Sequence, residues 1–228
     1  MQVVEIFRSI QGEGTLIGTP MVFIRLWGCD AGCVWCDTRY SWAPEFKDTT
    51  ERAQTNPEEL ATQLAKDFPN GEWFNFTGGE PTLWSKEIIE TIEHLTSLLP
   101  LAKTAIQTNG KKWHEALFRK MDKVCMDFKC PESGEESDLG NLKQLRPIDE
   151  AKFVVASEND LQYIHSVFDH YQTSAEVIIQ PVLWSDEPLE NYYDQLRTLV
   201  EDLNKRPIKN ARVLPQLHQL LWRDQNSR

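Results

Sequence analysis

Short apolar runs alternate with amphipathic helical patterns along most of the chain, and this alternation constrains the fold more than any other feature. A short apolar run indicates a buried strand, whereas apolar residues at every third or fourth position indicate a helix. Strands that alternate with helices build an α/β fold on a parallel sheet. We find about six such units, fewer than the eight of a closed barrel. The sequence therefore predicts one domain, residues 1–228, folded as a partial parallel (β/α)6-type barrel.

Several chemically distinctive residues stand at the ends of the predicted strands. The predicted strands span residues 20–26, 73–76, 104–107, 123–128, 152–156, 176–180 and 211–214. Five of them end at or shortly before Cys29, Gly78, Thr108, Lys129 and Gln180. Active sites of α/β folds lie at the carboxyl ends of the strands, so we expect these positions to share one site.

Three cysteines, Cys29, Cys33 and Cys36, follow the first predicted strand with the spacing C-x3-C-x2-C. Iron–sulfur clusters are held by thiolates, and a cube with four cysteine ligands has no iron free for another ligand. Three local thiolates leave one iron open. This spacing therefore predicts a 4Fe–4S cluster that can bind a small molecule and pass it an electron.

Two other uses of the cysteines fit the sequence less well. A structural zinc site takes four ligands, usually in two separated pairs, and neither Cys125 nor Cys130 belongs to a second pair or has a histidine at finger spacing. A disulfide framework is disfavoured because five cysteines are an odd number and sparse for 228 residues. We expect Cys125 and Cys130 to be a core thiol and a loop thiol.

Composition excludes several classes of protein. With 35 acidic and 24 basic residues the formal net charge is −11, which argues against binding a nucleic-acid backbone. The N-terminal residues lack the basic and apolar regions of a signal peptide or membrane anchor. No stretch approaches the roughly 20 apolar residues that span a bilayer. Together with three reactive thiols, these features predict a protein of the reducing cytoplasm.

Two motifs in combination carry a family resemblance. The cysteine motif has Trp35 before its third cysteine, and the next predicted strand ends in Gly78-Gly79-Glu80-Pro81. In this order they resemble the radical S-adenosylmethionine superfamily. The resemblance implies that S-adenosylmethionine chelates the open iron of the cluster. It also implies that one electron cleaves a carbon–sulfur bond of S-adenosylmethionine, giving a 5′-deoxyadenosyl radical that takes a hydrogen atom from the substrate.

Further motifs narrow the resemblance to one family. The run from Glu5 to Gly14, the segment 23–30 and Cys36-Asp37-Thr38 are similar to the 7-carboxy-7-deazaguanine synthases, as are segments 127–131, 180–182 and 215–218. The resemblance implies a lyase that contracts the ring of 6-carboxy-5,6,7,8-tetrahydropterin, with loss of ammonia, to 7-carboxy-7-deazaguanine on the route to queuosine and other deazapurines. It implies catalytic use of S-adenosylmethionine, a Mg²⁺ ion, an external electron donor such as flavodoxin, and a homodimer.

The resemblance also implies roles for individual residues. Substrate contacts would come from Ile10, Gln11, Gly12, Glu13, Arg25, Thr77 and His218, with Arg25, Glu13 and His218 taking part in catalysis. Cofactor contacts would come from Trp35, Asp37, Gly78, Gly79, Glu80, Thr108, Asp127, Phe128, Lys129, Gln180, Pro181, Val182 and Leu183. Cys29, Cys33 and Cys36 would bind the cluster, and the Thr38 hydroxyl would bind Mg²⁺, which prefers oxygen ligands.

Three of these residues have simpler interpretations. Arg25 carries a charge on a predicted strand, which suits a bidentate grip on a carboxylate but also a structural salt bridge. The Thr38 hydroxyl could instead cap its loop. His218 could be a proton shuttle, because imidazole titrates near neutrality, or only a packing residue.

Two other functions compete with the synthase. A glycyl-radical-enzyme activase has the same cysteine spacing, but its substrate is a protein backbone, which needs an open groove rather than an arginine for a small carboxylate. A non-catalytic iron–sulfur binding protein would need neither the open iron nor the Gly-Gly-Glu-Pro strand end. The sequence favours the small pterin substrate.

Overall fold

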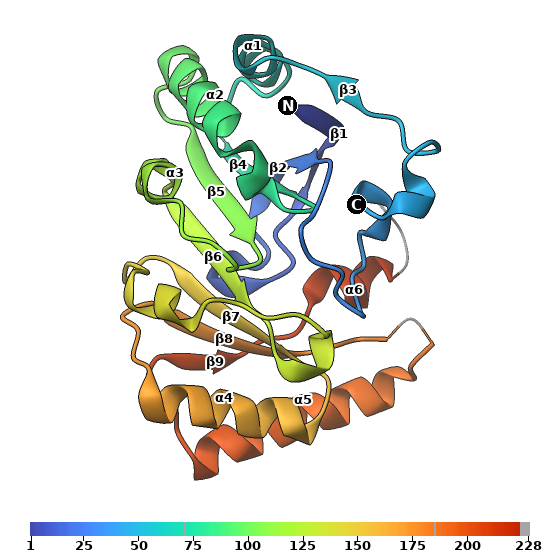
Figure 1. Ribbon diagram of the computed structural model, residues 1–228, viewed down its shortest axis with the longest axis vertical. Coiled ribbons are helices and arrows are strands. Elements are labelled where there is room, and N and C mark those ends of the chain that lie inside the picture. The colour runs from blue at the N-terminus through green and yellow to red at the C-terminus, as the bar shows by residue number, and fades with distance from the viewer. Residues whose placement is uncertain (71, 185, 224–228) are drawn as a thin grey trace.

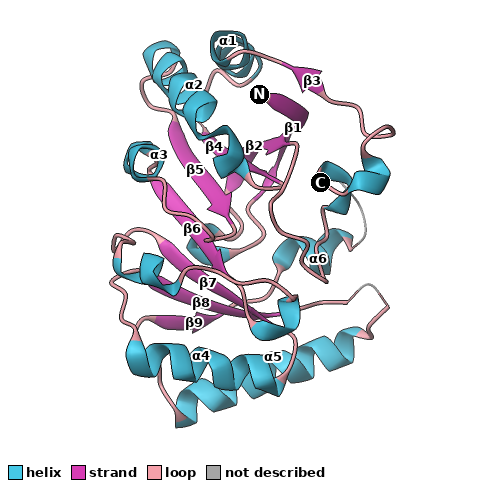
Figure 2. Ribbon diagram, viewed as in Figure 1, coloured by secondary structure: helices cyan, strands magenta, loops and turns pink. Residues whose placement is uncertain are grey.

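The strands form one nine-stranded sheet in the order β3-β1-β2-β4-β5-β6-β7-β8-β9 (Figure 1). The computed structural model describes residues 1–70, 72–184 and 186–223. β1 pairs antiparallel with β2 and β3, and each later neighbouring pair is parallel. The sheet curves into the expected partial barrel. Helices α1 to α5 lie along its outer face, and α6 lies on its inner side (Figure 2).

The elements have the following bounds. The strands are β1 (Gln2–Ile10), β2 (Pro20–Leu26), β3 (Ala53–Gln54), β4 (Trp73–Gly78), β5 (Lys103–Thr108), β6 (Lys123–Phe128), β7 (Glu150–Val155), β8 (Glu176–Pro181) and β9 (Ala211–Val213). The α-helices are α1 (Pro57–Asp67), α2 (Ser85–Leu98), α3 (Glu115–Lys120), α4 (Glu158–His170), α5 (Leu189–Lys205) and α6 (Leu217–Trp222). Short 3-10 helices are η1 (Gly14–Leu16), η2 (Arg39–Ser41), η3 (Pro44–Phe46), η4 (Pro81–Trp84), η5 (Pro131–Ser133) and η6 (Leu139–Lys143).

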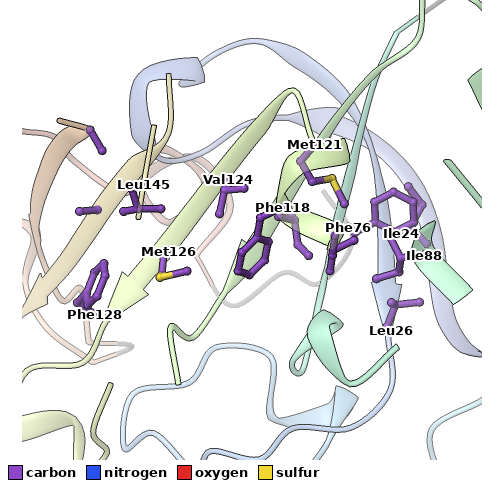
Figure 3. Packing of buried hydrophobic residues seen from close by; sticks show 14 of the residues in the cluster. Ile24, Leu26, Phe76, Ile88, Phe118, Met121, Val124, Met126, Phe128 and Leu145 are labelled. Atoms are coloured by element: carbon purple, nitrogen blue, oxygen red, sulfur yellow. The ribbon is translucent and has the colours of Figure 1, made fainter. Parts of the chain in front are cut away.

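Each strand divides its side chains between an outer core and the barrel interior. Phe74 and Phe76 of β4 are fully buried in the core. Asn75 is also fully buried but does not belong to that cluster, and Thr77 lines the cavity described below. Alternation along a strand explains the division, because successive side chains point to opposite faces. Figure 3 shows Phe76, Phe118 and Met126 among the packed side chains of the core.

Local sequence accounts for some element boundaries and not for others. Asn56 caps α1 as expected: its side chain accepts from the Glu59 amide at 2.9 Å, and the Glu59 carboxylate accepts from the Asn56 amide. Strand β1 was not predicted, because charged and apolar residues mix along it without a clear period. None of the helices in the described ranges is both long and apolar enough to cross a bilayer.

Candidate active site

A cavity of about 260 Å³ opens at the carboxyl ends of the parallel strands, inside the curve of the sheet. Most of the residues predicted for the site line it, although they come from segments far apart in the sequence. These are Ile10, Gln11, Gly12, Glu13, Arg25, Cys29, Cys33, Trp35, Cys36, Asp37, Thr38, Thr77, Gly78, Gly79, Thr108, Asp127, Lys129, Val182, Leu183 and His218. The structure thus brings the predicted cluster, substrate and cofactor residues to one place.

The loop that carries the cysteines is tied to neighbouring loops by backbone hydrogen bonds. The Gly28 amide donates to the Ser41 carbonyl at 2.9 Å, and the Val34 amide donates to the Ser133 carbonyl at 3.1 Å. The Gly32 amide donates to the Glu135 carboxylate at 2.6 Å. These bonds hold the backbone of the loop that carries the three cysteines.

The three thiols lie half-buried on the cavity wall. Each cysteine of a 4Fe–4S cube binds a different iron, and three thiolates leave the fourth iron open. Burial raises the pKa of Cys29 to about 12, so iron binding has to displace a proton. The Trp42 indole donates to the Cys36 sulfur at 3.2 Å, a contact of the kind that tunes cluster potentials.

The glycines of the Gly78-Gly79 strand end are required by close packing against the cysteine loop. A Cβ on Gly78, whose φ is +125°, would lie 2.3 Å from the Leu26 carbonyl oxygen. A Cβ on Gly79 would lie 2.0 Å from the Gly28 carbonyl oxygen. Real Cβ atoms do not approach backbone this closely, so only glycine lets this strand end lie against the loop.

Glu80 joins two strand ends rather than facing the cavity. Its carboxylate is almost fully buried and accepts from the amide and hydroxyl of Thr82, the Thr108 hydroxyl and the Asn109 amide, at 2.6–2.9 Å. Burial raises the pKa of Glu80, against the effect of these donors. Its side chain therefore positions the ends of β4 and β5.

Glu13 is the centre of a buried network at the opposite wall. One carboxylate oxygen, Oε1, accepts a hydrogen bond from the side-chain amide of Gln180 at 2.6 Å and another from the side-chain amide of Gln216 at 2.7 Å. The other, Oε2, accepts from the Lys152 ammonium at 2.6 Å. Burial alone would raise the pKa of Glu13, but the charges of Lys152 and His218 and these donors hold it well below its usual range. Glu13 is therefore ionised on the cavity wall.

Asp127 shares its Oδ2 oxygen between two lysines. The Lys129 ammonium lies 3.1 Å from Oδ2 and the Lys152 ammonium 3.3 Å from it. The other oxygen, Oδ1, is buried and has no hydrogen-bond partner among the described residues. A buried acceptor without a partner is costly, so a bound hydroxyl donor would stabilise it. This orphan oxygen fits the predicted contact with the ribose of S-adenosylmethionine.

Arg25 takes part in a structural bridge and also lines the cavity. Its Nε donates to Glu5 at 2.6 Å, and Glu5 also accepts from the Tyr40 hydroxyl at 2.6 Å. The guanidinium carbon lies 5.5 Å from the centre of the Phe7 ring and 5.6 Å from that of Tyr40. The salt bridge uses Nε, while the two terminal nitrogens carry four further N–H donors. The two interpretations of Arg25 are therefore compatible.

Helix α6 supplies the wall that faces the cysteine loop. A Cβ on Gly12 would lie 2.2 Å from His218 Nδ1, so the imidazole packs directly on the Gly12 backbone. His218 Nε2 lies 3.4 Å from the Asp37 carboxylate, and the Gln219 amide donates to the same carboxylate at 3.1 Å. Burial would lower the pKa of His218, but Asp37 and Glu13 raise it. The Asp37 side chain is about half exposed, and the neighbouring His218 lowers its pKa.

The Thr38 hydroxyl does not cap the turn that follows it. Thr38 occupies the N-cap position of η2 but makes no side-chain cap hydrogen bond, and it is the Thr38 carbonyl that accepts from Ser41. Its hydroxyl lies 3.6 Å from the Cys36 sulfur, on the cavity wall. The hydroxyl therefore does not cap η2.

Several predicted positions lie elsewhere than expected. Phe128 is fully buried in the core and stacks on Phe153, and Pro181 lines a separate groove between α4 and α5. The alternation of side chains along β6 turns Phe128 away from the interior that Asp127 faces. Gln180 reaches the site through its bond to Glu13. Cys130 is part of the core, whereas the buried Cys125 lies on the cavity wall.

Sequence reasoning missed some residues of the cavity wall, including Phe7, Gln107, Lys152 and Gln216. Lys152 carried a usable signal, because a charged residue stands in the apolar run of a buried strand, as Arg25 does. Gln216 had no such sequence signal, apart from lying in segment 215–218, which is similar to the synthase family.

Comparisons with known proteins agree with this geometry. A family model described as a 4Fe-4S single cluster domain matches residues 10–130. A 7-carboxy-7-deazaguanine synthase from Methanospirillum hungatei is 34% identical over 221 residues, covering 97% of this chain and 85% of the relative. Another from Bacillus cereus is 32% identical over 237 residues, covering 96% and 95%.

A crystal structure of QueE from Escherichia coli has the same fold, with a TM-score of 0.72 at 22% identity over 95% of this chain and 94% of that one. These findings confirm the resemblance expected from the motifs. The chain belongs to the 7-carboxy-7-deazaguanine synthase family of radical S-adenosylmethionine enzymes.

Proposed function

We propose that this protein is a lyase that contracts the ring of 6-carboxy-5,6,7,8-tetrahydropterin to 7-carboxy-7-deazaguanine, with loss of ammonia, in the biosynthesis of queuosine and related deazapurines. The observation that carries the proposal is the meeting of three cysteines, Arg25 and Glu13 in one cavity at the carboxyl ends of the strands. When bound, the reduced cluster supplies the electron that starts the radical chemistry. Residues 1–228 act as one domain.

The residues of the cavity divide into two groups in this proposal. Arg25 grips the substrate carboxylate, Glu13 accepts from ring N–H groups, and His218 holds or moves a proton beside them. Ile10, Gln11, Gly12 and Thr77 complete the substrate wall. Asp127 and Lys129 hold the ribose of S-adenosylmethionine, with Trp35, Asp37, Val182 and Leu183 nearby, while Gly78, Gly79, Glu80 and Thr108 shape the strand ends.

The Thr38 hydroxyl is the proposed protein ligand of a Mg²⁺ ion. It is not used as a cap and lies on the cavity wall. Because Mg²⁺ keeps several waters and needs few protein oxygens, one hydroxyl together with a substrate carboxylate suffices. The ion would orient that carboxylate beside the cluster. An external one-electron donor such as flavodoxin, a homodimer and a cytoplasmic location belong to the same proposal.

The residues that line the site favour a small substrate over the competing functions. A protein backbone would need an open groove and no arginine for a small carboxylate, whereas this partly open cavity brings Arg25 and the 10–13 segment together beside the cysteines. Asp127 lines the cavity, and its buried Oδ1 has no donor among the described residues. A buried acceptor without a partner is costly, which argues against a purely structural cluster.

Anaerobic turnover tests the proposal directly. Protein reconstituted with iron and sulfide is incubated with dithionite, S-adenosylmethionine, Mg²⁺ and 6-carboxytetrahydropterin, and products are read by mass spectrometry. We expect 7-carboxy-7-deazaguanine and no net consumption of S-adenosylmethionine. Intact pterin with cleaved S-adenosylmethionine would show a working cluster with the wrong substrate, and would overturn the proposal.

A further inference from the structure

Four buried charges alternate in sign across the floor of the cavity. Glu13 contacts Lys152, Lys152 contacts Asp127, and Asp127 contacts Lys129, with nitrogen–oxygen distances of 2.6, 3.3 and 3.1 Å. The row runs from the proposed substrate wall to the proposed ribose contact. Lys152 stands in its middle and is the one cation of the row that touches both carboxylates.

We propose that Lys152 is a positioning residue for the substrate subsite, which aims one oxygen of Glu13 at the N–H groups of the bound ring. This inference rests on the proposed function and deepens it. Lys152 does not itself touch the reacting atoms in this scheme; it acts through Glu13.

The two carboxylate oxygens of Glu13 differ in how many further hydrogen bonds they can accept. A carboxylate oxygen accepts about two hydrogen bonds. Oε1 already has two donors, the amides of Gln180 and Gln216. Oε2 has one donor among the described residues, the Lys152 ammonium. Glu13 can therefore accept a further hydrogen bond on Oε2, the oxygen that Lys152 contacts. The Lys152 ammonium then fixes the direction of the remaining lone pair of that oxygen.

Lys152 also helps to keep Glu13 ionised. Gln180 and Gln216 are neutral, so Lys152 is the cation in direct contact with the carboxylate. Burial raises the pKa of Glu13, and Lys152 lowers it together with His218 and the side-chain amide of Gln216. A protonated Glu13 would lose acceptor capacity on the oxygen that carries the proton. The other titratable groups whose charges act on Glu13 include His218, Asp37, Cys125 and Tyr192. Asp127 shares the Lys152 ammonium with Glu13.

Lys129 provides a matched control. Lys129 contacts the same oxygen of Asp127 but is not one of the three residues that donate hydrogen bonds to the Glu13 carboxylate. If Lys152 acts through Glu13, its loss should weaken substrate binding, whereas loss of Lys129 should weaken S-adenosylmethionine binding. Asp127 keeps one lysine in either variant.

The experiment measures both affinities by calorimetry on cluster-loaded protein without reductant, so no turnover is needed. We compare Lys152→Met, Glu13→Gln, the double variant and Lys129→Met. Loss of a charge-assisted bond predicts about 10- to 100-fold weaker binding of 6-carboxytetrahydropterin to Lys152→Met at pH 8, with S-adenosylmethionine affinity within about 3-fold of wild type. Lys129→Met should show the reverse pattern.

One further readout separates positioning from general damage. The double variant should bind the pterin no more weakly than Glu13→Gln, because residues that act through each other are not additive. Should Lys152→Met fail to hold its cluster, the double variant carries the test, since it removes both buried charges.

Additive losses in the double variant, an unchanged pterin affinity in Lys152→Met, or an equal loss of both ligands would each overturn the inference. Failure of the wild-type protein to bind or convert the pterin would instead overturn the proposed function.

Discussion

Two buried ion pairs on the same strand show how differently similar residues are used. Glu150 and Lys152 stand two positions apart on β7, and both belong to the barrel interior. Glu150, at the amino end, accepts from the amide and hydroxyl of Thr15 and lies 3.0 Å from the Lys123 ammonium. Lys152, at the carboxyl end, lines the cavity beside Asp127, which has an unpaired oxygen.

Burial and pairing therefore do not identify a functional residue. Glu150 and Lys152 are about equally buried, with 2% and 6% of their surfaces exposed. The difference lies in where the two residues stand. At the amino end, Thr15 and Lys123 meet on one oxygen of Glu150, which is not among the residues that line the cavity. At the carboxyl end, Lys152, Glu13 and Asp127 all line the cavity, and Asp127 Oδ1 has no donor among the described residues. The amino end holds the barrel together, and the carboxyl end is prepared for ligands.

The largest expected effect comes from the cysteine loop. Cys36→Ala should abolish product formation and the electron paramagnetic signal of the reduced cluster, because a cube with two thiolate ligands is not retained. Iron content, about four per chain in the reconstituted wild type, should fall, while thermal unfolding of the apoprotein stays close to wild type. A Cys36→Ala protein that keeps a normal cluster signal would place the third thiolate elsewhere.

Glu150→Gln tests the structural end of the comparison. Removing one partner of a buried pair leaves the Lys123 charge uncompensated, so we expect a loss of about 3 kcal/mol in the free energy of unfolding. Urea unfolding measures this, and activity per folded molecule should remain normal. Arg212→Ala is the control, because it breaks an exposed pair with Glu176 that should matter little. A Glu150→Gln protein that is stable but inactive would show that the amino end of β7 also serves activity, and would contradict the comparison.

Arg25→Ala tests the ligand-facing end. Loss of a charge-assisted contact in a largely buried cavity should weaken pterin binding by about 2–5 kcal/mol. Cluster content and uncoupled cleavage of S-adenosylmethionine should change far less. Because Arg25 also pairs with Glu5, unfolding has to be measured alongside binding. Unchanged pterin affinity would move Arg25 to the structural group with Glu150.

Thr38→Ala should give the smallest effect. Loss of one oxygen ligand should raise the Mg²⁺ concentration needed for half-maximal activity, and added Mg²⁺ should restore part of the rate. Thr38→Ser keeps the hydroxyl and should stay close to wild type. A Mg²⁺ titration of all three proteins checks this. If Thr38→Ala follows the wild-type curve, the metal site lies elsewhere.

The parts of the molecule that sequence predicts are those with local signals. The parallel strands, the capped start of α1 and the cysteine loop each follow from a few neighbouring residues. Strand β1 lacks such a signal, because its partner β2 and the antiparallel register decide its pairing. The contact between Glu13 and Gln216 joins positions 203 residues apart and could not be foreseen from spacing. Lys152 could have been found by the rule that singled out Arg25, since both are charges on buried strands.

The seating of α6 on Gly12 has a consequence for the order in which the site can form during synthesis. The Leu217 amide donates to the Gly12 carbonyl at 2.8 Å, so the last described helix closes against the first loop. A nascent chain that has reached only β9 already holds every cysteine and every strand of the sheet, yet one wall of its cavity is missing. This wall of the site therefore has to wait until α6 has left the ribosome. A chain that ends before residue 217 would lack this wall beside the iron-binding loop.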